Sequence, residues 1–99
     1  MVTKKQSLTA FDASEYLQSE EDVIAYLSAA LEDGDVNLIS AVLGDIAKSK
    51  GMTDIAAKSG LSRTSLYKAL SSDGNPELAT ILKVVNALGY RLQLEPINQ

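Results

Sequence analysis

Basic side chains are concentrated in the middle of an otherwise acidic chain. The 99 residues carry a formal net charge of −4, and residues 1–45 hold two lysines against nine acidic residues. Residues 46–70 contain one acidic residue, Asp54, and five basic ones, Lys48, Lys50, Lys58, Arg63 and Lys68. Lysine and arginine side chains can neutralise phosphates, and arginine can also bond to the edge of guanine. The middle segment is therefore a candidate nucleic-acid-binding site.

Several of these side chains share one short stretch with hydroxyl groups. From a helix in the major groove of DNA, the side chains that can reach bases or phosphates are Ser62, Arg63, Thr64, Tyr67 and Lys68. Arg63, close to the start of the helix, is the strongest candidate for reading a base. Thr53 and the amides around it are expected to face a phosphate, with Lys48, Lys50 and Lys58 as further phosphate contacts. The alternative is an ordinary solvated surface.

The elements that must position these side chains are two short helices. Residues 52–70 read MTDIAAKSGLSRTSLYKAL, in which Thr53 is expected to cap the first helix and Ser62 the second. Gly60 permits the left-handed backbone that ends the first helix, while Leu61 and Leu66 are expected to enter the core. The pattern predicts a helix-turn-helix, against the alternative of a plain helical corner.

The flanking sequence predicts further helices. Residues 1–7 are expected to form a flexible tail, and structure is expected from Leu8 onward. Before Gly34, the expected N-caps are Asp12, paired with Glu15, and Ser19, paired with Asp22. Asp35 is expected to cap a helix that runs to Gly51. Its apolar residues recur at helical spacing: Val36, Ile39, Leu43 and Ile46.

The last predicted helix begins at Asn75 as N-cap, with Pro76 at the first helical position, and ends at Gly89. Its predicted buried stripe contains Leu78, Ile81, Leu82, Val85 and Leu88.

Residues 90–96 are expected to form a strand, because apolar and polar residues alternate up to Pro96. This strand can pair with a symmetry mate, so Tyr90, Leu92 and Leu94 are candidate residues of a homodimer interface. A dimer is expected because one recognition helix reads only a few base pairs of a palindromic operator. The alternative is that the strand packs on its own core.

Composition excludes several classes of function. The chain has no cysteine and no histidine, which argues against metal sites, and we expect no cofactor. It lacks an apolar stretch long enough for a membrane span or a signal peptide, so a cytoplasmic protein without a membrane partner is expected. Ser62, Ser65 and Lys68 suggest a serine nucleophile only superficially, because helix capping explains the serines. The chain is expected not to be an enzyme.

Two stretches carry a resemblance to a known family: residues 8–35, LTAFDASEYLQSEEDVIAYLSAALEDGD, and residues 51–89, with LSRTSLYKALS followed by GNP. They resemble the probable addiction module antidote proteins, HigA-like antitoxins with a Cro/CI-type helix-turn-helix. The resemblance implies a partner encoded next to the chain, a basic RelE- or HigB-like toxin that cleaves RNA, and repression of the shared operon. The acidic residues that can contact this toxin are Glu15, Glu20, Glu21, Asp22, Glu32 and Asp33.

The expected fold is mainly all-α, a lambda-repressor-type bundle of five or six helices with a short C-terminal strand. Residues 8–99 are expected to form a single domain: acidic helices over 8–34, the helix-turn-helix core over 35–89 and the strand over 90–96. The expected function is a DNA-binding repressor that neutralises a toxin. Two alternatives stay open: a phage-type Cro/CI-like repressor without a toxin, and a helical protein-interaction module that does not bind DNA.

Overall fold

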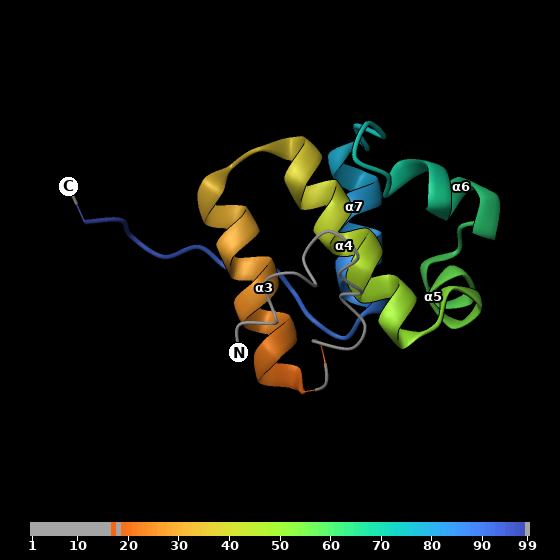
Figure 1. Cartoon of the computed structure of the whole chain (residues 1–99), viewed down its shortest axis with the longest axis horizontal. Helices are drawn as coiled ribbons and strands as arrows, with labels where there is room; N and C mark the ends of the chain where they lie inside the picture. Colours follow the sequence, from red (N-terminus) through yellow and green to blue (C-terminus); the bar gives the residue numbers. More distant parts are fainter. Residues whose placement is uncertain (1–16, 18, 99) are drawn as a thin grey trace, which may run out of the picture.

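A computed structural model describes residues 17 and 19–98, and within them the chain is helical without strands. Figure 1 labels the five helices of this part: α3 (Glu20–Asp33), α4 (Val36–Lys50), α5 (Met52–Ser59), α6 (Arg63–Ala69) and α7 (Leu78–Ala87). None of these helices is long and apolar enough to cross a bilayer. The predicted tail over 1–7, the start at Leu8 and the cap at Asp12 lie outside the described residues.

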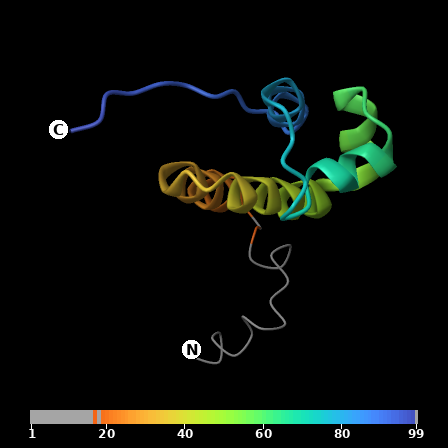
Figure 2. The same cartoon turned by 90° about the horizontal axis from the view of Figure 1, so that it is seen from above.

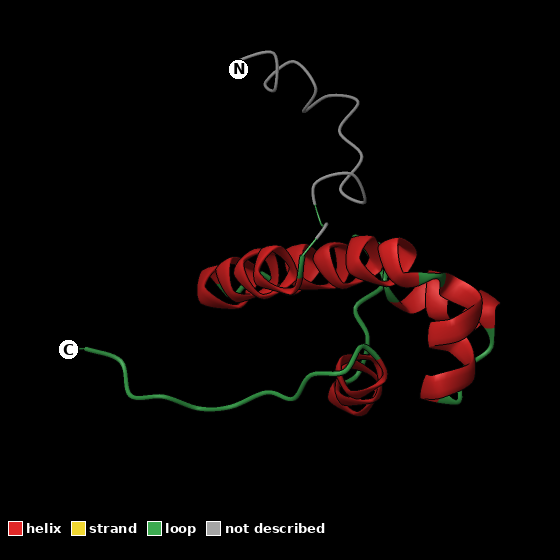
Figure 3. Ribbon diagram, turned by 90° about the horizontal axis from the view of Figure 1, so that it is seen from below, coloured by secondary structure: helices red, strands yellow, loops and turns green. Residues whose placement is uncertain are grey.

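Helices α3 and α4 lie side by side and form one layer, as Figures 2 and 3 show from opposite sides. Helix α7 lies on one side of this layer, and α5 contacts α4, α6 and α7. Helices α5 and α6 occupy one end of the molecule, whereas the C-terminal residues extend past α3 at the other end (Figure 1). The arrangement leaves one side of α6 without a covering helix.

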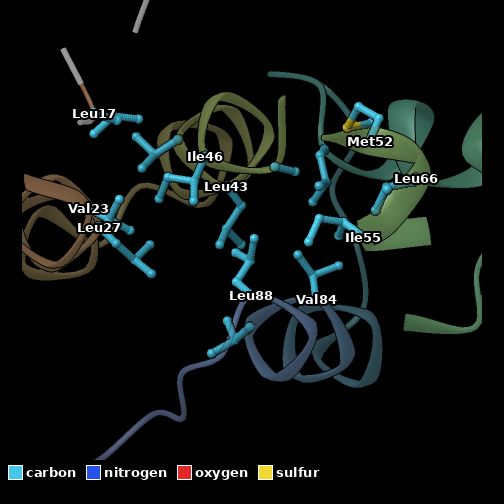
Figure 4. Close-up of a cluster of buried hydrophobic side chains, with 14 of the residues drawn as sticks. Leu17, Val23, Leu27, Leu43, Ile46, Met52, Ile55, Leu66, Val84 and Leu88 are labelled. Atoms are coloured by element: carbon cyan, nitrogen blue, oxygen red, sulfur yellow. The ribbon is translucent and has the colours of Figure 1, made fainter. Parts of the chain in front are cut away.

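One hydrophobic core joins all five helices. Its most buried large side chains come from α4, α5, α6 and α7 and are at most 1% exposed: Leu43, Ile46, Ile55, Leu66 and Val84. Val23 and Leu27 of α3 extend the same cluster, as the close-up in Figure 4 shows. Burial of such side chains is the main force that holds helices of this length in place.

The N-caps predicted for α3 and α4 are confirmed. The hydroxyl of Ser19 accepts a hydrogen bond from the Asp22 amide at 3.1 Å, and the Asp22 carboxylate accepts one from the Ser19 amide at 3.3 Å. Gly34 ends α3 in the left-handed conformation, with φ 81°, and the Asp35 carboxylate accepts from the Asn37 amide at 3.0 Å. These local signals therefore fix where α3 and α4 begin.

Two predicted helix starts are wrong. Helix α5 begins at Met52 directly after Gly51, so Thr53 lies inside its first turn and is not the cap. Gly51 has a φ of 106° and turns the chain from α4 into α5 without further residues. Helix α7 begins at Leu78 with Glu77 as its N-cap, because Asn75 has a φ of 46°, outside the extended region that an N-cap occupies.

Part of the predicted buried stripe is also wrong. Leu78 and Leu82 of α7 are 68% and 45% exposed, and Val36 of α4 is 48% exposed. Val85 and Leu88 of the predicted stripe are buried, at 2% and 5% exposed, and the buried side of α7 also carries Val84, which was not predicted. Apolar residues cover more than half of the circumference of α7, so their spacing could not select which arc faces the core.

The strand predicted over residues 90–96 is not formed in the described chain. Tyr90 packs against the core instead, which was the alternative considered for this segment, while Leu94 is fully exposed. A strand needs a neighbour for its backbone groups, and no part of the described chain provides one.

Candidate nucleic-acid interface

The α5–α6 unit (residues 52–70) is a pair of short helices joined by a tight turn. Gly60 has a φ of 80° and ends α5, with its amide donating to the Ala56 carbonyl at 3.0 Å. The Leu61 amide donates to the same carbonyl at 3.2 Å. Ser62 then caps α6, since its hydroxyl accepts from the Ser65 amide at 3.0 Å. The turn predicted at Gly60 and the cap predicted at Ser62 are therefore confirmed.

Buried side chains anchor the inner side of the unit. Ile55 and Leu66 are 1% and 0% exposed, and Leu70, immediately after α6, is 4% exposed. The backbone of Leu70 also approaches α4 very closely: a Cβ atom added to Gly44 would lie 2.5 Å from the Leu70 carbonyl oxygen. The end of α6 therefore rests directly on α4, and this contact fixes the direction of α6.

The outer side of α6 brings together four of the predicted contact residues. Arg63, Thr64, Tyr67 and Lys68 are all exposed, and their spacing of one, three and four residues places them on one side of a helix. Leu66, between them in sequence, points to the core. The surface of α6 thus presents a guanidinium, an ammonium and two hydroxyl groups next to one another, which are donors suited to phosphates and base edges.

Arg63 and Tyr67 also contact each other. A guanidinium nitrogen of Arg63 donates to the Tyr67 hydroxyl at 3.5 Å, and the guanidinium carbon lies 5.7 Å from the centre of the Tyr67 ring. This pair restricts the freedom of a long side chain and keeps the guanidinium along the exposed side of α6. Tyr67 is therefore both a candidate contact to nucleic acid and a support for the Arg63 side chain.

The other predicted phosphate contacts lie outside α6 and differ in how free their side chains are. Thr53 and Lys48 are exposed. Lys58 forms an ion pair with Asp54, at 3.1 Å between Nζ and Oδ2. The ammonium of Lys50 lies 5.8 Å from the centre of the Tyr90 ring and borders a hollow with Glu20, so it faces α3 and not α6. Lys48 and Lys58 remain available near the α5–α6 unit, because an exposed ion pair is weak.

The predicted acidic residues that the structure describes differ in their contacts. Glu15 lies outside the described residues, and Asp22 forms part of the α3 cap. Glu20 accepts a hydrogen bond from the Tyr90 hydroxyl at 3.4 Å. Desolvation, and to a lesser degree this carboxylate, raise the pKa of Tyr90 above its ordinary value of 10.0. The exposed acids that remain are Glu21, Glu32 and Asp33.

Sequence reasoning did not identify two pairs within the α5–α6 unit. Both Asp54 with Lys58 and Arg63 with Tyr67 are separated by four residues, the distance at which side chains meet on a helix. That spacing was the signal that could have found them. It could not reveal the contact between Lys50 and Tyr90, because those residues are far apart in sequence and meet only in the folded chain.

Comparison with known proteins adds independent information. A family model described as "Probable addiction module antidote protein" matches residues 7–96. An uncharacterised protein of Haemophilus influenzae is 44% identical over 90 residues, which cover 91% of this chain and 93% of the relative. No solved structure matches the chain significantly.

Proposed function

The chain belongs to the family of probable addiction module antidote proteins, and from this premise we propose that it is an antitoxin that also binds DNA as a repressor. Its α5–α6 unit acts as a helix-turn-helix of the Cro/CI kind, and α6 enters the major groove. The protein acts in the cytoplasm by binding alone and catalyses no reaction. A homodimer recognises an operator with two related half-sites and blocks transcription of its operon.

The observation that carries the DNA-binding proposal is the two-sided character of α6. Leu66 and the backbone of Leu70 fix one side on the core, while Arg63, Tyr67 and Lys68 cover the other. A helix that is rigidly held and still exposes its basic side can enter a groove without rearranging. The concentration of positive charge in residues 46–70 supports this in a chain whose other parts would repel DNA.

Replacing Arg63 by alanine is expected to weaken operator binding about 5- to 150-fold, the equivalent of about 1–3 kcal/mol for a bidentate contact to guanine. The sequence preference at one position of each half-site should relax as well. Mobility-shift titrations on the upstream DNA of the gene, with single base substitutions, measure both effects. Unchanged affinity and preference would contradict the assignment of α6.

Lys68→Ala is the matched comparison on the same side of α6. If Lys68 contacts a phosphate, this variant loses affinity for all sequences alike, and the slope of log affinity against log salt falls by about one unit. A protein-interaction module that does not bind DNA predicts no shift with either the parent protein or the variants. The two substitutions therefore separate base reading from charge attraction.

For the antitoxin role we propose a basic, RNA-cleaving toxin of the RelE or HigB kind, encoded by the neighbouring gene. Glu21 and Glu32 of α3 support this partner. They are eleven residues apart, which is close to three helical turns, so they lie on the same side of α3, and both are exposed. Carboxylates placed in this way can attract the basic RNA-binding surface of such a toxin and cover it.

The double variant Glu21→Lys and Glu32→Lys is expected to slow association with the toxin about tenfold or more at low salt, because steering by opposite charges becomes repulsion. Surface plasmon resonance with the neighbouring gene product measures the rate. Glu77→Lys, an exposed acid before α7, serves as the control and should leave the rate nearly unchanged. Equal rates for all three proteins would exclude this side of α3 as the toxin contact. A gene neighbourhood of phage genes without a small basic protein would favour the phage-type repressor instead.

A further inference from the structure

The C-terminal segment (residues 91–98) is extended and has no backbone partner within the described chain. The last backbone hydrogen bond before it is donated by the Tyr90 amide to the Val85 carbonyl at 3.1 Å. Leu92, Leu94 and Ile97 are 39%, 101% and 75% exposed. Figure 1 shows this segment passing α3 and then extending beyond the helices. A segment with free backbone groups and exposed apolar side chains has the properties of an unpaired strand.

The beginning of the segment borders an apolar groove on α3. Ile24 and Leu31 of α3, which are 50% and 40% exposed, line this groove together with Leu92. Apolar side chains from two elements therefore leave a shared surface uncovered. An occupant of this groove would have to bring apolar side chains and at the same time satisfy the backbone of residues 91–95.

We propose that this occupant is a second copy of the chain, whose C-terminal segment pairs antiparallel with the first about a twofold axis at Gln93. Residues 91–95 read Arg-Leu-Gln-Leu-Glu, and this order is complementary to itself when reversed. Arg91 comes to lie opposite Glu95 of the second copy, and Leu92 opposite its Leu94. The charged pairs share one face of the ribbon, and the leucines share the other face with the α3 groove.

The backbone supports the same register. With Gln93 on the axis, Tyr90 lies opposite Pro96 of the second copy. Pro96 has no amide hydrogen, and the amide of Tyr90 already donates to Val85, so neither residue can donate to a partner strand. If Gln93 faces its mate in a hydrogen-bonded pair, the alternation of an antiparallel ladder places Tyr90 and Pro96 where no donor is needed. A shift by one residue would place leucine opposite glutamate.

This inference names the interface of the homodimer in the proposed function, and it rests on that dimer but not on DNA binding. The α5–α6 unit lies at the opposite end of the molecule from the C-terminal segment (Figure 1). The dimer would therefore hold two copies of α6 far apart, at its two ends. The spacing of the half-sites would follow from this arrangement.

Charge exchange tests the register directly in sedimentation experiments without DNA. Arg91→Glu places two glutamates opposite each other, twice in each dimer, and Glu95→Arg does the same with arginines. Each single variant is expected to weaken dimerisation about tenfold or more, since each cross-strand pair contributes roughly 0.2–1 kcal/mol and attraction turns into repulsion. Mixing the two single variants should restore a dimer, because glutamates at 91 and 95 of one chain then face arginines at 95 and 91 of the other.

A cysteine scan gives a second measurement, since the chain has no cysteine of its own. Opposite residues in a hydrogen-bonded antiparallel pair have Cα atoms about 5.5 Å apart, within the roughly 4.4–6.8 Å that a disulfide spans. Gln93→Cys should therefore cross-link under mild oxidation, while Asn98→Cys, far from the axis, should not.

Several results of the sedimentation experiments would contradict this interface. A monomeric parent protein, unaffected single variants, or a mixture that stays monomeric overturns the proposed interface. So does a dimer lost on Leu82→Ser, at the exposed side of α7, but kept by the charge variants. Arg63→Ala should remain dimeric, so a failure of DNA recognition is distinguishable from a failure of this interface. Circular dichroism of each variant verifies that the helices are intact.

Discussion

Leu66→Ala is expected to lower the free energy of unfolding by about 2–5 kcal/mol, the range for removing a fully buried leucine. The Leu66 side chain is 0% exposed and is the buried residue of α6 (Figure 4). Its loss leaves a cavity beneath a helix of seven residues, which is too short to be stable without packing. Because small domains are stable by only about 5–15 kcal/mol, this change removes a large part of the total. Urea unfolding monitored by circular dichroism measures the effect.

Leu82→Ala is the matched control for this prediction. It makes the same chemical change on α7, but the Leu82 side chain is 45% exposed, so the cost should stay below about 1 kcal/mol. DNA binding separates the two variants further. Loss of Leu66 should weaken binding by releasing α6 from the core even where the other helices remain folded. Equal destabilisation by the two substitutions would mean that the described packing of α6 is wrong.

Gly44→Ala is expected to destabilise the protein by about 1–3 kcal/mol, although the same change in an exposed helix would stabilise it by roughly 0.5–1 kcal/mol. Gly44 lies within α4 and is buried. The added Cβ would meet the Leu70 carbonyl oxygen at 2.5 Å, and a main-chain atom cannot rotate away as a side chain can. To accommodate the methyl group, Leu70 and the end of α6 must move away from α4. Thermal and urea unfolding determine the sign, which is the decisive result.

The functional consequence of Gly44→Ala should appear in DNA binding, because Leu70 directly follows α6 and any displacement changes the direction of that helix. Gly34→Ala provides a control for strain alone. Gly34 has a φ of 81° and open space around its Cβ position, so alanine there costs stability through the left-handed backbone and touches no neighbour. Operator affinity of the folded Gly34 variant should equal that of the parent protein. A Gly44 variant that is more stable than the parent would refute the close contact.

Features set by neighbouring residues could be predicted well. Each helix cap depends on one side chain and on the amides within three residues of it, as at Ser19, Asp35 and Ser62. The turn at Gly60 depends on the left-handed backbone that glycine permits. The exposed basic side of α6 followed in the same way from the spacing of its residues. The predicted starts of α5 and α7 are wrong although Thr53 and Asn75 have side chains suited to capping. Gly51, with a φ of 106°, precedes α5, and the positive φ of Asn75 is incompatible with an N-cap.

Features set by distant contacts could not be predicted. Local signals were sufficient to predict a succession of helices between residues 20 and 87, the turn at Gly60 between two short helices, and the concentration of positive charge around that turn. Hydrophobic spacing, capping and charge are properties of neighbouring residues. Packing between distant residues accounts for the exposure of Leu78 and Leu82, for the contact of Lys50 with Tyr90, and for the lack of a strand partner for residues 91–98 within the part of the chain that the structure describes. Each of these features depends on which surfaces pack together. The residues of one helix with apolar side chains on several sides do not specify which side is buried, and the residues of one strand do not specify its partner.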